Sequence, residues 1–168
     1  MTSLIWQFLS YFGDIQYWLG LTVAILIIYQ ILDKQDKKRM AWIVFALLPA
    51  IIISSQLTFS IQNIFQVPRP CAGLVDCPGE FSFPSAHATL IFAFATVVSL
   101  NTMKYKIYLF VFPLAVLVAL SRVFLNYHTY PDIIVGALIG IFSGYLTYLS
   151  YKTIPSLFKE TKRKRHLR

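Results

Sequence analysis

Residues 131–151 read PDIIVGALIGIFSGYLTYLSY, with a single charged side chain, Asp132, near the start. A helix needs about 20 predominantly apolar residues to cross the hydrocarbon core of a bilayer, so this stretch predicts a membrane-spanning helix. Gly136, Gly140 and Gly144 recur every four residues on the face that carries Asp132. Small residues at this spacing let a second helix approach closely, either within one chain or between two copies. We expect packing within the chain, which turns Asp132 toward the interior of the bundle.

Four other stretches share this length and apolar character, at 16–32, 41–65, 84–100 and 106–124. Residues 1–15 include a short, aromatic-rich apolar segment at 3–12, which suits a helix lying in the membrane interface better than one crossing the bilayer. The sequence therefore predicts an all-α fold, an integral membrane helical bundle of about five transmembrane helices plus an N-terminal interfacial helix. The 168 residues predict a single domain.

The composition supports this class of protein. Apolar residues make up 57% of the chain and charged residues 13%, whereas soluble domains average about 45–50% and about 25%. These values argue against both an intrinsically disordered chain and a soluble enzyme. No basic residue precedes the first apolar stretch, which argues against a cleaved signal peptide.

The placement of charge orients the predicted bundle. The net charge is +8, and all of the 15 basic residues except Arg69 and Arg122 fall on one side of an alternating five-helix path. The positive-inside rule makes this side cytoplasmic. The N-terminus, the 66–83 loop and the 125–130 turn are then extracytoplasmic, and 152–168 form a basic cytoplasmic tail. Attraction to anionic lipid explains the Lys-Arg-Lys-Arg run at 162–165 better than a nucleic-acid partner does.

Ionisable side chains gather on the predicted outer side, where charges at membrane helix ends are costly and usually functional. They include Arg69, Arg122, His87, His128 and Asp132. Asp132 follows His128 by four residues, close enough for its carboxylate to hold the imidazole in one tautomer. Two arginines beside a helix N-terminus describe a pocket for a tetrahedral oxyanion. Two histidines, one backed by a carboxylate, describe a nucleophile and a general acid.

Neighbouring residues complete this pattern. Gln62 precedes Arg69 by seven residues, about two helical turns, so the two share a face if the helix continues. Pro68 and Pro70 bracket Arg69 and end that helix, which leaves the guanidinium at the membrane surface. Ser85 lies where it can act near the N-cap of the third predicted span.

These residues resemble the three-part signature of the type 2 phosphatidic acid phosphatase (PAP2) superfamily of integral-membrane lipid phosphatases. The signature is Lys, six residues, Arg-Pro; then Pro-Ser-Gly-His; then Ser-Arg, five residues, His, three residues, Asp. This chain has, in the same order, Gln62 to Arg69-Pro70, Pro84-Ser85-Ala86-His87, and Ser121-Arg122 to His128 and Asp132. The family usually has six helices, and the interfacial segment is counted here as the sixth.

The resemblance implies a role for each matched residue. His128 would attack phosphorus, Asp132 would orient and polarise it, and His87 would protonate the leaving oxygen. The phosphate ligands would be Arg69, Arg122, Ser85 and the backbone amide of Ala86. No metal or other cofactor is implied. The expected function is therefore metal-independent hydrolysis of a membrane lipid phosphate or diphosphate at the extracytoplasmic face, through a phosphohistidine intermediate.

Two positions depart from the family pattern. Ala86 replaces glycine, which adds only a methyl group if the amide still faces phosphate. Gln62 replaces lysine, so the pocket has one cation fewer, although an amide can still donate a hydrogen bond. We assign Gln62 to the phosphate-binding set, with its contact to phosphate left open.

The substrate and several alternatives remain open at this point. An envelope lipid such as lipid A 1-phosphate or undecaprenyl diphosphate is favoured over phosphatidylglycerophosphate or phosphatidic acid. A catalytically inactive PAP2-like protein that binds or transports lipid is the alternative from another class. A vanadate haloperoxidase fits less well, because the haloperoxidases that share this residue pattern are soluble enzymes. A helical bundle that binds haem through two histidines also fits less well. An oligomer is possible but not indicated.

Cys71 and Cys77 lie in the predicted outer loop near Arg69. Two thiols are too few for a structural zinc site, which takes four ligands. A disulfide closing this loop is expected if the compartment is oxidising, and the two residues are otherwise ordinary thiols.

Overall fold

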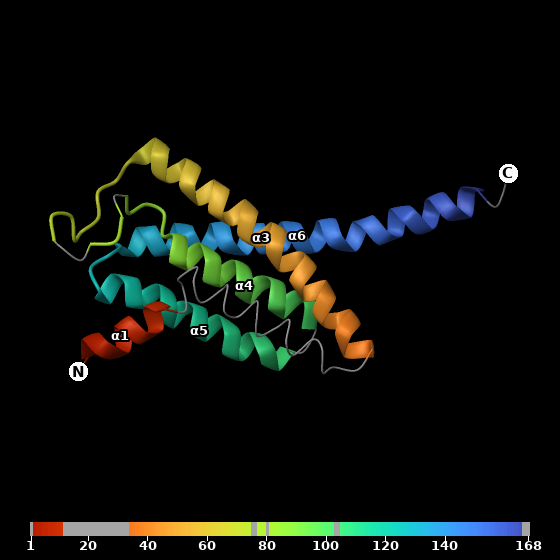
Figure 1. Cartoon of the computed structure of the whole chain (residues 1–168), viewed down its shortest axis with the longest axis horizontal. Helices are drawn as coiled ribbons and strands as arrows, with labels where there is room; N and C mark the ends of the chain where they lie inside the picture. The colour runs from red at the N-terminus through yellow and green to blue at the C-terminus, as the bar shows by residue number, and fades with distance from the viewer. Residues whose placement is uncertain (1, 12–33, 75–76, 80, 103–104, 166–168) are drawn as a thin grey trace.

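The structure is a computed structural model that describes residues 2–11, 34–74, 77–79, 81–102 and 105–165. Its regular elements within these ranges are helices, as the sequence predicts (Figure 1). They are α1 (Thr2–Tyr11), α3 (Lys34–Phe65), α4 (Ala86–Thr102), α5 (Tyr105–Phe124) and α6 (Tyr130–Arg165). An isolated antiparallel bridge pairs Pro68 with Phe81 in the connection between α3 and α4.

Three of these helices are long and apolar enough to cross a membrane. The apolar stretches are Phe45–Phe65, Ile107–Phe124 and Tyr130–Ser150, with mean hydropathies of 1.5, 2.2 and 1.8. Helix α4 contains a shorter apolar stretch, Ala86–Leu100. These four coincide closely with the spans predicted at 41–65, 106–124, 131–151 and 84–100. The span predicted at 16–32 lies outside the described residues.

The two ends of the chain add detail to the prediction. Helix α1 forms within the segment assigned to the interface and packs against α5, where Trp6 stacks on Phe124 with ring centroids 4.2 Å apart. Its Leu4, Ile5 and Phe8 side chains remain exposed. At the other end, α6 continues as a helix to Arg165, so most of the predicted basic tail extends the last span (Figure 1).

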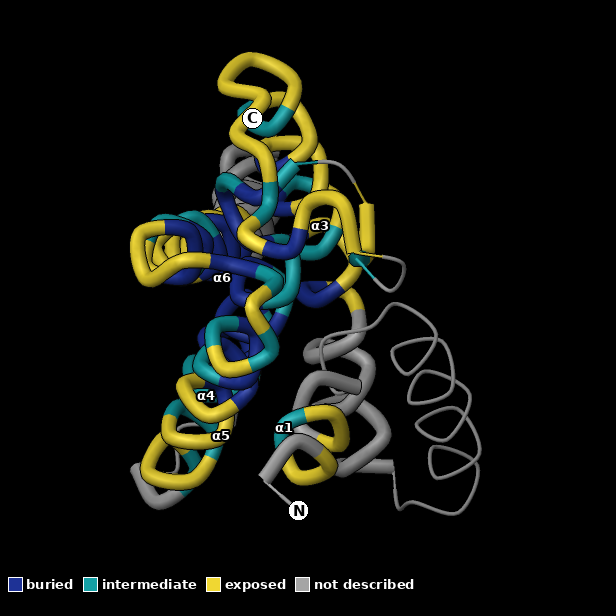
Figure 2. The backbone as a smooth tube through the Cα atoms, turned by 90° about the vertical axis from the view of Figure 1, so that its left-hand side faces the viewer, coloured by how far each residue is buried: buried dark blue, intermediate teal, exposed yellow. Residues whose placement is uncertain are grey.

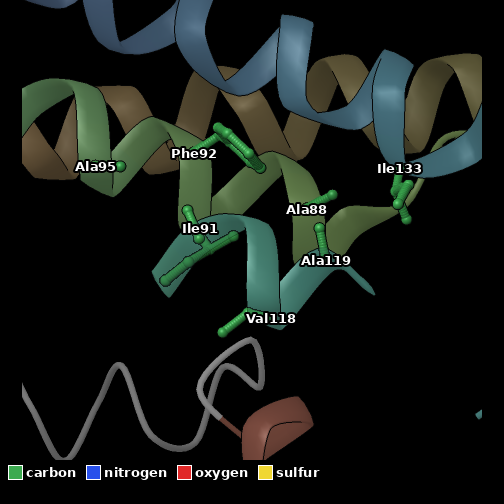
Figure 3. Close-up of a cluster of buried hydrophobic side chains, with 8 residues drawn as sticks. Ala88, Ile91, Phe92, Ala95, Val118, Ala119 and Ile133 are labelled. Carbon is green, nitrogen blue, oxygen red and sulfur yellow. The ribbon is translucent and has the colours of Figure 1, made fainter. Parts of the chain in front are cut away.

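Helix α4 is the centre of the bundle, in contact with α3, α5 and α6. The burial pattern reflects this position, because buried backbone concentrates where α4 and α6 meet, whereas much of α3 and α5 is exposed (Figure 2). A cluster of small and branched side chains from α4, α5 and α6 fills the space between these helices (Figure 3): Ala88, Ile91, Phe92, Ala95, Ala115, Val118, Ala119 and Ile133.

The glycines of α6 explain why α4 and α6 lie so close together. A Cβ atom on Gly136 would lie 2.6 Å from the carbonyl oxygen of Ser85, and one on Gly140 would overlap that of Thr89. One on Gly144 would lie 2.9 Å from the carbonyl oxygen of Ala93 in α4. Contacts this short leave no room for a side chain. The glycines therefore serve packing within the chain, as expected.

Candidate active site

The predicted site residues converge at one end of the bundle. The C-terminal ends of α3 and α5 and the N-terminal ends of α4 and α6 all lie there, beside the connection between α3 and α4 (Figure 1). Residues that are far apart in sequence are joined directly at this end. Arg69 contacts His128, and Ser82 contacts both His128 and Asp132.

Arg69 lies on an extended segment that a short pairing holds in place. Helix α3 ends at Phe65, and Gln66 adopts a left-handed conformation (φ 47°) that redirects the chain. The amide of Ser82 then donates to the carbonyl oxygen of Val67 (2.7 Å). Arg69 Nη1 lies 3.0 Å from His128 Nε2, and Arg69 Nε is buried with no hydrogen-bond partner among the described residues. A guanidinium with a buried unused donor suits an anionic ligand.

His128 is buried in the turn between α5 and α6, and its ring is held from both sides. Nε2 faces Arg69, and Nδ1 lies 2.8 Å from the carbonyl oxygen of Ser82. A guanidinium can only donate hydrogen bonds and a carbonyl oxygen can only accept them. The neutral ring therefore carries its proton on Nδ1 and has its lone pair on Nε2.

The surroundings of His128 keep the imidazole neutral. Burial lowers its pKa to about 4, and the positive charges of Arg69 and Arg122 act in the same direction, against the opposing effect of Asp132. Burial also lowers the pKa of Arg69, against the effect of the Asp132 charge. A guanidinium still remains charged. At neutral pH, an uncharged imidazole thus faces a cation.

Asp132 lies beside His128, as the four-residue spacing predicts, but its carboxylate bonds other groups. Its carboxylate was expected to hold the imidazole directly, but Oδ2 lies 3.6 Å from Nδ1 of His128, which is beyond hydrogen-bonding distance. Oδ2 instead accepts hydrogen bonds from the hydroxyl of Ser82 and from the amide of Thr129 (2.7 Å). Spacing along a helix places Asp132 near His128, but Ser82, a residue from another segment, makes the direct hydrogen bonds to both of them.

The N-terminus of α4 is fastened to α6. The amide of Ser85 donates to the carbonyl oxygen of Asp132 (3.0 Å), and the Ser85 hydroxyl lies 3.5 Å from the amide of Ala88, as a weak cap. Ser85 is fully buried. Ala86 is the first residue of the helix, and His87 follows it, half-buried. A helix N-terminus of this kind favours an anion.

Gln62 uses its side-chain amide on the protein. Its Nε2 donates to the carbonyl oxygen of Pro84 (2.9 Å), which immediately precedes Ser85. The residue that replaces the family lysine therefore links the end of α3 to the segment that leads into α4. This contact supports the shape of the pocket.

Arg122 lies in the last turn of α5 and is 3% exposed. Its guanidinium carbon lies 4.6 Å from the centre of the Tyr127 ring, a cation–π contact. The Arg122 carbonyl oxygen also accepts hydrogen bonds from the amides of Tyr127 (3.0 Å) and His128 (3.2 Å). Arg122 thus anchors the turn that carries His128.

Cys71 and Cys77 are joined by a disulfide, with Cα atoms 5.6 Å apart. The bridge begins two residues after Arg69, and the chain that follows it passes beside Arg69, since a Cβ atom on Gly79 would lie 3.7 Å from Arg69 Nη2. Gly79 adopts a positive φ of 75°, which favours glycine. No group of three or more His, Cys, Asp or Glu side chains within the described residues could hold a metal ion.

Three contributors were missed by sequence reasoning: Ser82, Thr129 and Tyr127. Ser82 is fully buried and lies three residues before Ser85. Its importance comes from contacts to residues 46 and 50 positions away, which no local spacing could reveal.

Taken together, the chain is a helical membrane protein in which Arg69, Ser82, His128 and Asp132 meet at one end of the bundle. The model of the PAP2 superfamily matches residues 39–155. The chain therefore belongs to the PAP2 superfamily, as the sequence motifs indicated.

Two curated relatives are similar over most of this chain. An undecaprenyl-diphosphatase of Sulfolobus acidocaldarius is 28% identical over 150 residues, which cover 88% of this chain and 70% of the relative. Dolichyldiphosphatase 1 of Dictyostelium discoideum is 27% identical over 151 residues, which cover 82% of this chain and 64% of the relative. The chain thus spans slightly less than two thirds of the second relative.

Two solved structures have a similar fold. LpxE of Aquifex aeolicus has a TM-score of 0.68 at 28% identity, over 88% of this chain and 85% of that one. The transmembrane PAP2-type phosphatidylglycerolphosphate phosphatase of Bacillus subtilis has a TM-score of 0.71 at 21% identity, over 91% of this chain and 78% of that one. The second comparison bears on the fold alone.

Proposed function

We propose that this protein is a membrane lipid phosphatase that hydrolyses a lipid phosphate or diphosphate through a phosphohistidine intermediate on His128. The observation that carries this proposal is the state of the His128 ring. Its Nδ1 proton is held by the carbonyl oxygen of Ser82, and its Nε2 lone pair faces the guanidinium of Arg69. A neutral imidazole with an available lone pair beside an anion-binding cation is suited to attack phosphorus.

The proposed reaction has two steps. The phosphoryl group binds Arg69, Arg122, Ser85 and the Ala86 amide, and its negative charge draws Arg69 away from Nε2. Nε2 then forms a bond to phosphorus while the bond to the lipid oxygen breaks, and His87 gives that oxygen a proton. In the second step His87 removes a proton from water, the water oxygen attacks phosphorus, and the P–N bond breaks to release phosphate and the neutral ring.

The proposed substrate is an envelope lipid such as undecaprenyl diphosphate or lipid A 1-phosphate. Two relatives whose names describe polyprenyl diphosphatases support a diphosphate substrate. Phosphatidylglycerophosphate and phosphatidic acid are the other candidates. Gln62 brings no charge and bonds the carbonyl oxygen of Pro84, so we propose that it shapes the pocket and that the substrate meets one cation fewer.

The test is phosphate release by the purified protein in detergent, with EDTA present, from a panel of these lipids. We expect release by the wild type and loss of at least about a thousandfold in His128→Ala, because no other group replaces the nucleophile. Ser143→Ala is the matched control, since the hydroxyl of this buried serine donates to the carbonyl oxygen of Ile139 in its own helix. Release by His128→Ala at the wild-type rate would contradict the proposal. A folded wild type that releases phosphate from no lipid would favour the inactive lipid-binding alternative.

We also propose that the site faces the extracytoplasmic side and that the C-terminus is cytoplasmic, since the basic residues favour this orientation. The variant Tyr130→Cys introduces a thiol at an exposed position beside the site. In sealed right-side-out vesicles, a membrane-impermeant maleimide should label this thiol without disruption of the membrane. Labelling that requires disruption would reverse the orientation.

A further inference from the structure

Ser82 occupies a central position, and the proposed reaction has so far drawn only on its carbonyl oxygen. It is fully buried and lies between α3 and α4, outside the matched motifs. All three of its polar groups are engaged. The amide donates to Val67 (2.7 Å), the carbonyl oxygen accepts from His128 Nδ1 (2.8 Å), and the hydroxyl donates to Asp132.

These contacts separate two tasks that a carboxylate next to a histidine normally combines. The Nδ1 proton of His128 goes to the carbonyl oxygen of Ser82, so a peptide group selects the tautomer. The carboxylate of Asp132 stays 3.6 Å away, where its negative charge still acts on the ring. That carboxylate is positioned by two donors, the Ser82 hydroxyl and the Thr129 amide.

We propose that Ser82 is the positioning residue of this site: its carbonyl oxygen fixes the tautomer of His128, and its hydroxyl fixes the carboxylate of Asp132 beside the ring. The inference rests on the proposed function, because it describes how the nucleophile of that reaction is prepared. The same residue connects the segment that carries Arg69 through its bond to Val67. One buried serine therefore couples three segments that meet at the phosphate.

The consequence during the reaction follows from charge. When Nε2 bonds to phosphorus, the ring becomes positively charged, and a nearby carboxylate stabilises that charge. The carboxylate can do so only if it is held in place, since rotation would remove its field from the ring. The Ser82 carbonyl oxygen keeps its contact with the Nδ1 proton throughout, because Ser82 is held by its amide, which donates to Val67, and by its hydroxyl, which donates to Asp132.

The first experiment concerns the tautomer and needs no turnover. Imidazole nitrogen NMR of the purified protein in micelles would report the protonation of each ring nitrogen of His128, assigned by difference from His128→Ala. We expect the wild type and Asp132→Asn to show the same tautomer, with the proton on Nδ1, because Ser82 and Arg69 hold the ring. A switch or mixture of tautomers in Asp132→Asn would overturn the inference, since Asp132 would then be the residue in control.

The second experiment concerns the hydroxyl. Ser82→Ala keeps the carbonyl oxygen and removes the donor to Asp132. We expect kcat to fall about tenfold, the effect of losing one charge-assisted hydrogen bond, with KM changed less than about twofold. Ser143→Ala, an equally buried serine in α6, should retain both constants. A kcat of Ser82→Ala equal to that of the wild type would overturn this part, as would a rise in KM of the same size as the fall in kcat.

The two proposals fail in different ways. If the wild type releases no phosphate, the proposed function fails, whereas the NMR comparison still decides how the tautomer is set. If the wild type is active and His128→Ala is not, but Ser82→Ala behaves as the wild type, the phosphatase stands and the role of the Ser82 hydroxyl is wrong.

Discussion

Helix α6 packs against α4 and against α5 in opposite ways. Toward α4, three glycines bring backbone against backbone, and the amide of Ser85 bonds the carbonyl oxygen of Asp132 across the contact. Toward α5, the helices separate around an open apolar pocket of about 470 Å³ away from the site, lined by Thr96, Ser99, Leu100, Tyr108, Phe112, Ile141 and Tyr145. Close packing is therefore found between α4 and α6, where it holds the N-termini of these two helices at a fixed distance from each other.

The largest effect should come from breaking the α4–α6 contact at its closest point. In Gly140→Val the new side chain meets the backbone of Thr89, which cannot move aside as a side chain could. We expect destabilisation of about 3 kcal/mol or more and little folded protein. Thermal unfolding and size exclusion in detergent would measure this. Leu138→Val, at a 61% exposed position of the same helix, is the control. A Gly140→Val protein as stable as this control would show that the close contact contributes little.

A milder change should displace the site while sparing the fold. A Cβ on Gly136 would lie 2.6 Å from the carbonyl oxygen of Ser85, so Gly136→Ala must shift the first turn of α4. We expect destabilisation of about 1–2 kcal/mol and a fall in kcat/KM of about tenfold, because small displacements of positioned groups slow catalysis strongly. Kinetics and thermal unfolding of one preparation would test this. Loss of stability with unchanged kcat/KM would separate the contact from the site.

The burial of His128 predicts that kcat/KM falls only at an unusually low pH. Because its pKa is lowered to about 4, the ring should stay neutral at pH 6 and be half protonated near pH 4. Protonation occupies the Nε2 lone pair, so kcat/KM, corrected for substrate ionisation, should fall about twofold near pH 4. Because the unfolded residue titrates near its ordinary value, stability should also decline as the pH falls from about 6.5 toward 4. Titration of His128 by NMR with a midpoint near 6.5 would contradict this account.

The smallest effect is expected on the α5 side. Ile141 lines this open pocket and is 37% exposed, so Ile141→Val removes a methylene group where the helices are not closely packed. We expect a change in stability of less than about 0.5 kcal/mol and unchanged kcat/KM. The same unfolding and kinetic measurements apply. An effect as large as that of Gly136→Ala would mean that both sides of α6 support the site equally.

The elements that the sequence predicted are those set by local physics. Hydropathy and length located the helices that contain Phe45–Phe65, Ile107–Phe124 and Tyr130–Ser150, because a bilayer demands a minimum apolar length whatever the helices pack against. Successive membrane helices also run in opposite directions, so every second connection between helices lies at the same end of the bundle. This is why Arg69, His128 and Ser85 could be grouped before any contact was known.

Contacts across the bundle were decided only by the tertiary structure. The sequence could not show that Ser82 would bond both His128 and Asp132, because the distance between residues 46 or 50 positions apart depends on how the helices pack. For the same reason the partner of Gln62 was open, and it proved to be the carbonyl oxygen of Pro84.

The glycines of α6 illustrate the division between the two levels. Their four-residue spacing in the sequence determined that some helix could approach closely on that face. Which helix it is, and that Thr89 lies against Gly140, was decided by the packing of the whole bundle. The sequence by itself thus determined the class of protein and the long apolar helices within the described residues, and it grouped Arg69, Ser85 and His128 at one end, since these follow from apolar length and local spacing. The tertiary structure decided which group holds each reacting atom, because hydrogen bonds depend on distances of tenths of an ångström that arise only when the helices meet.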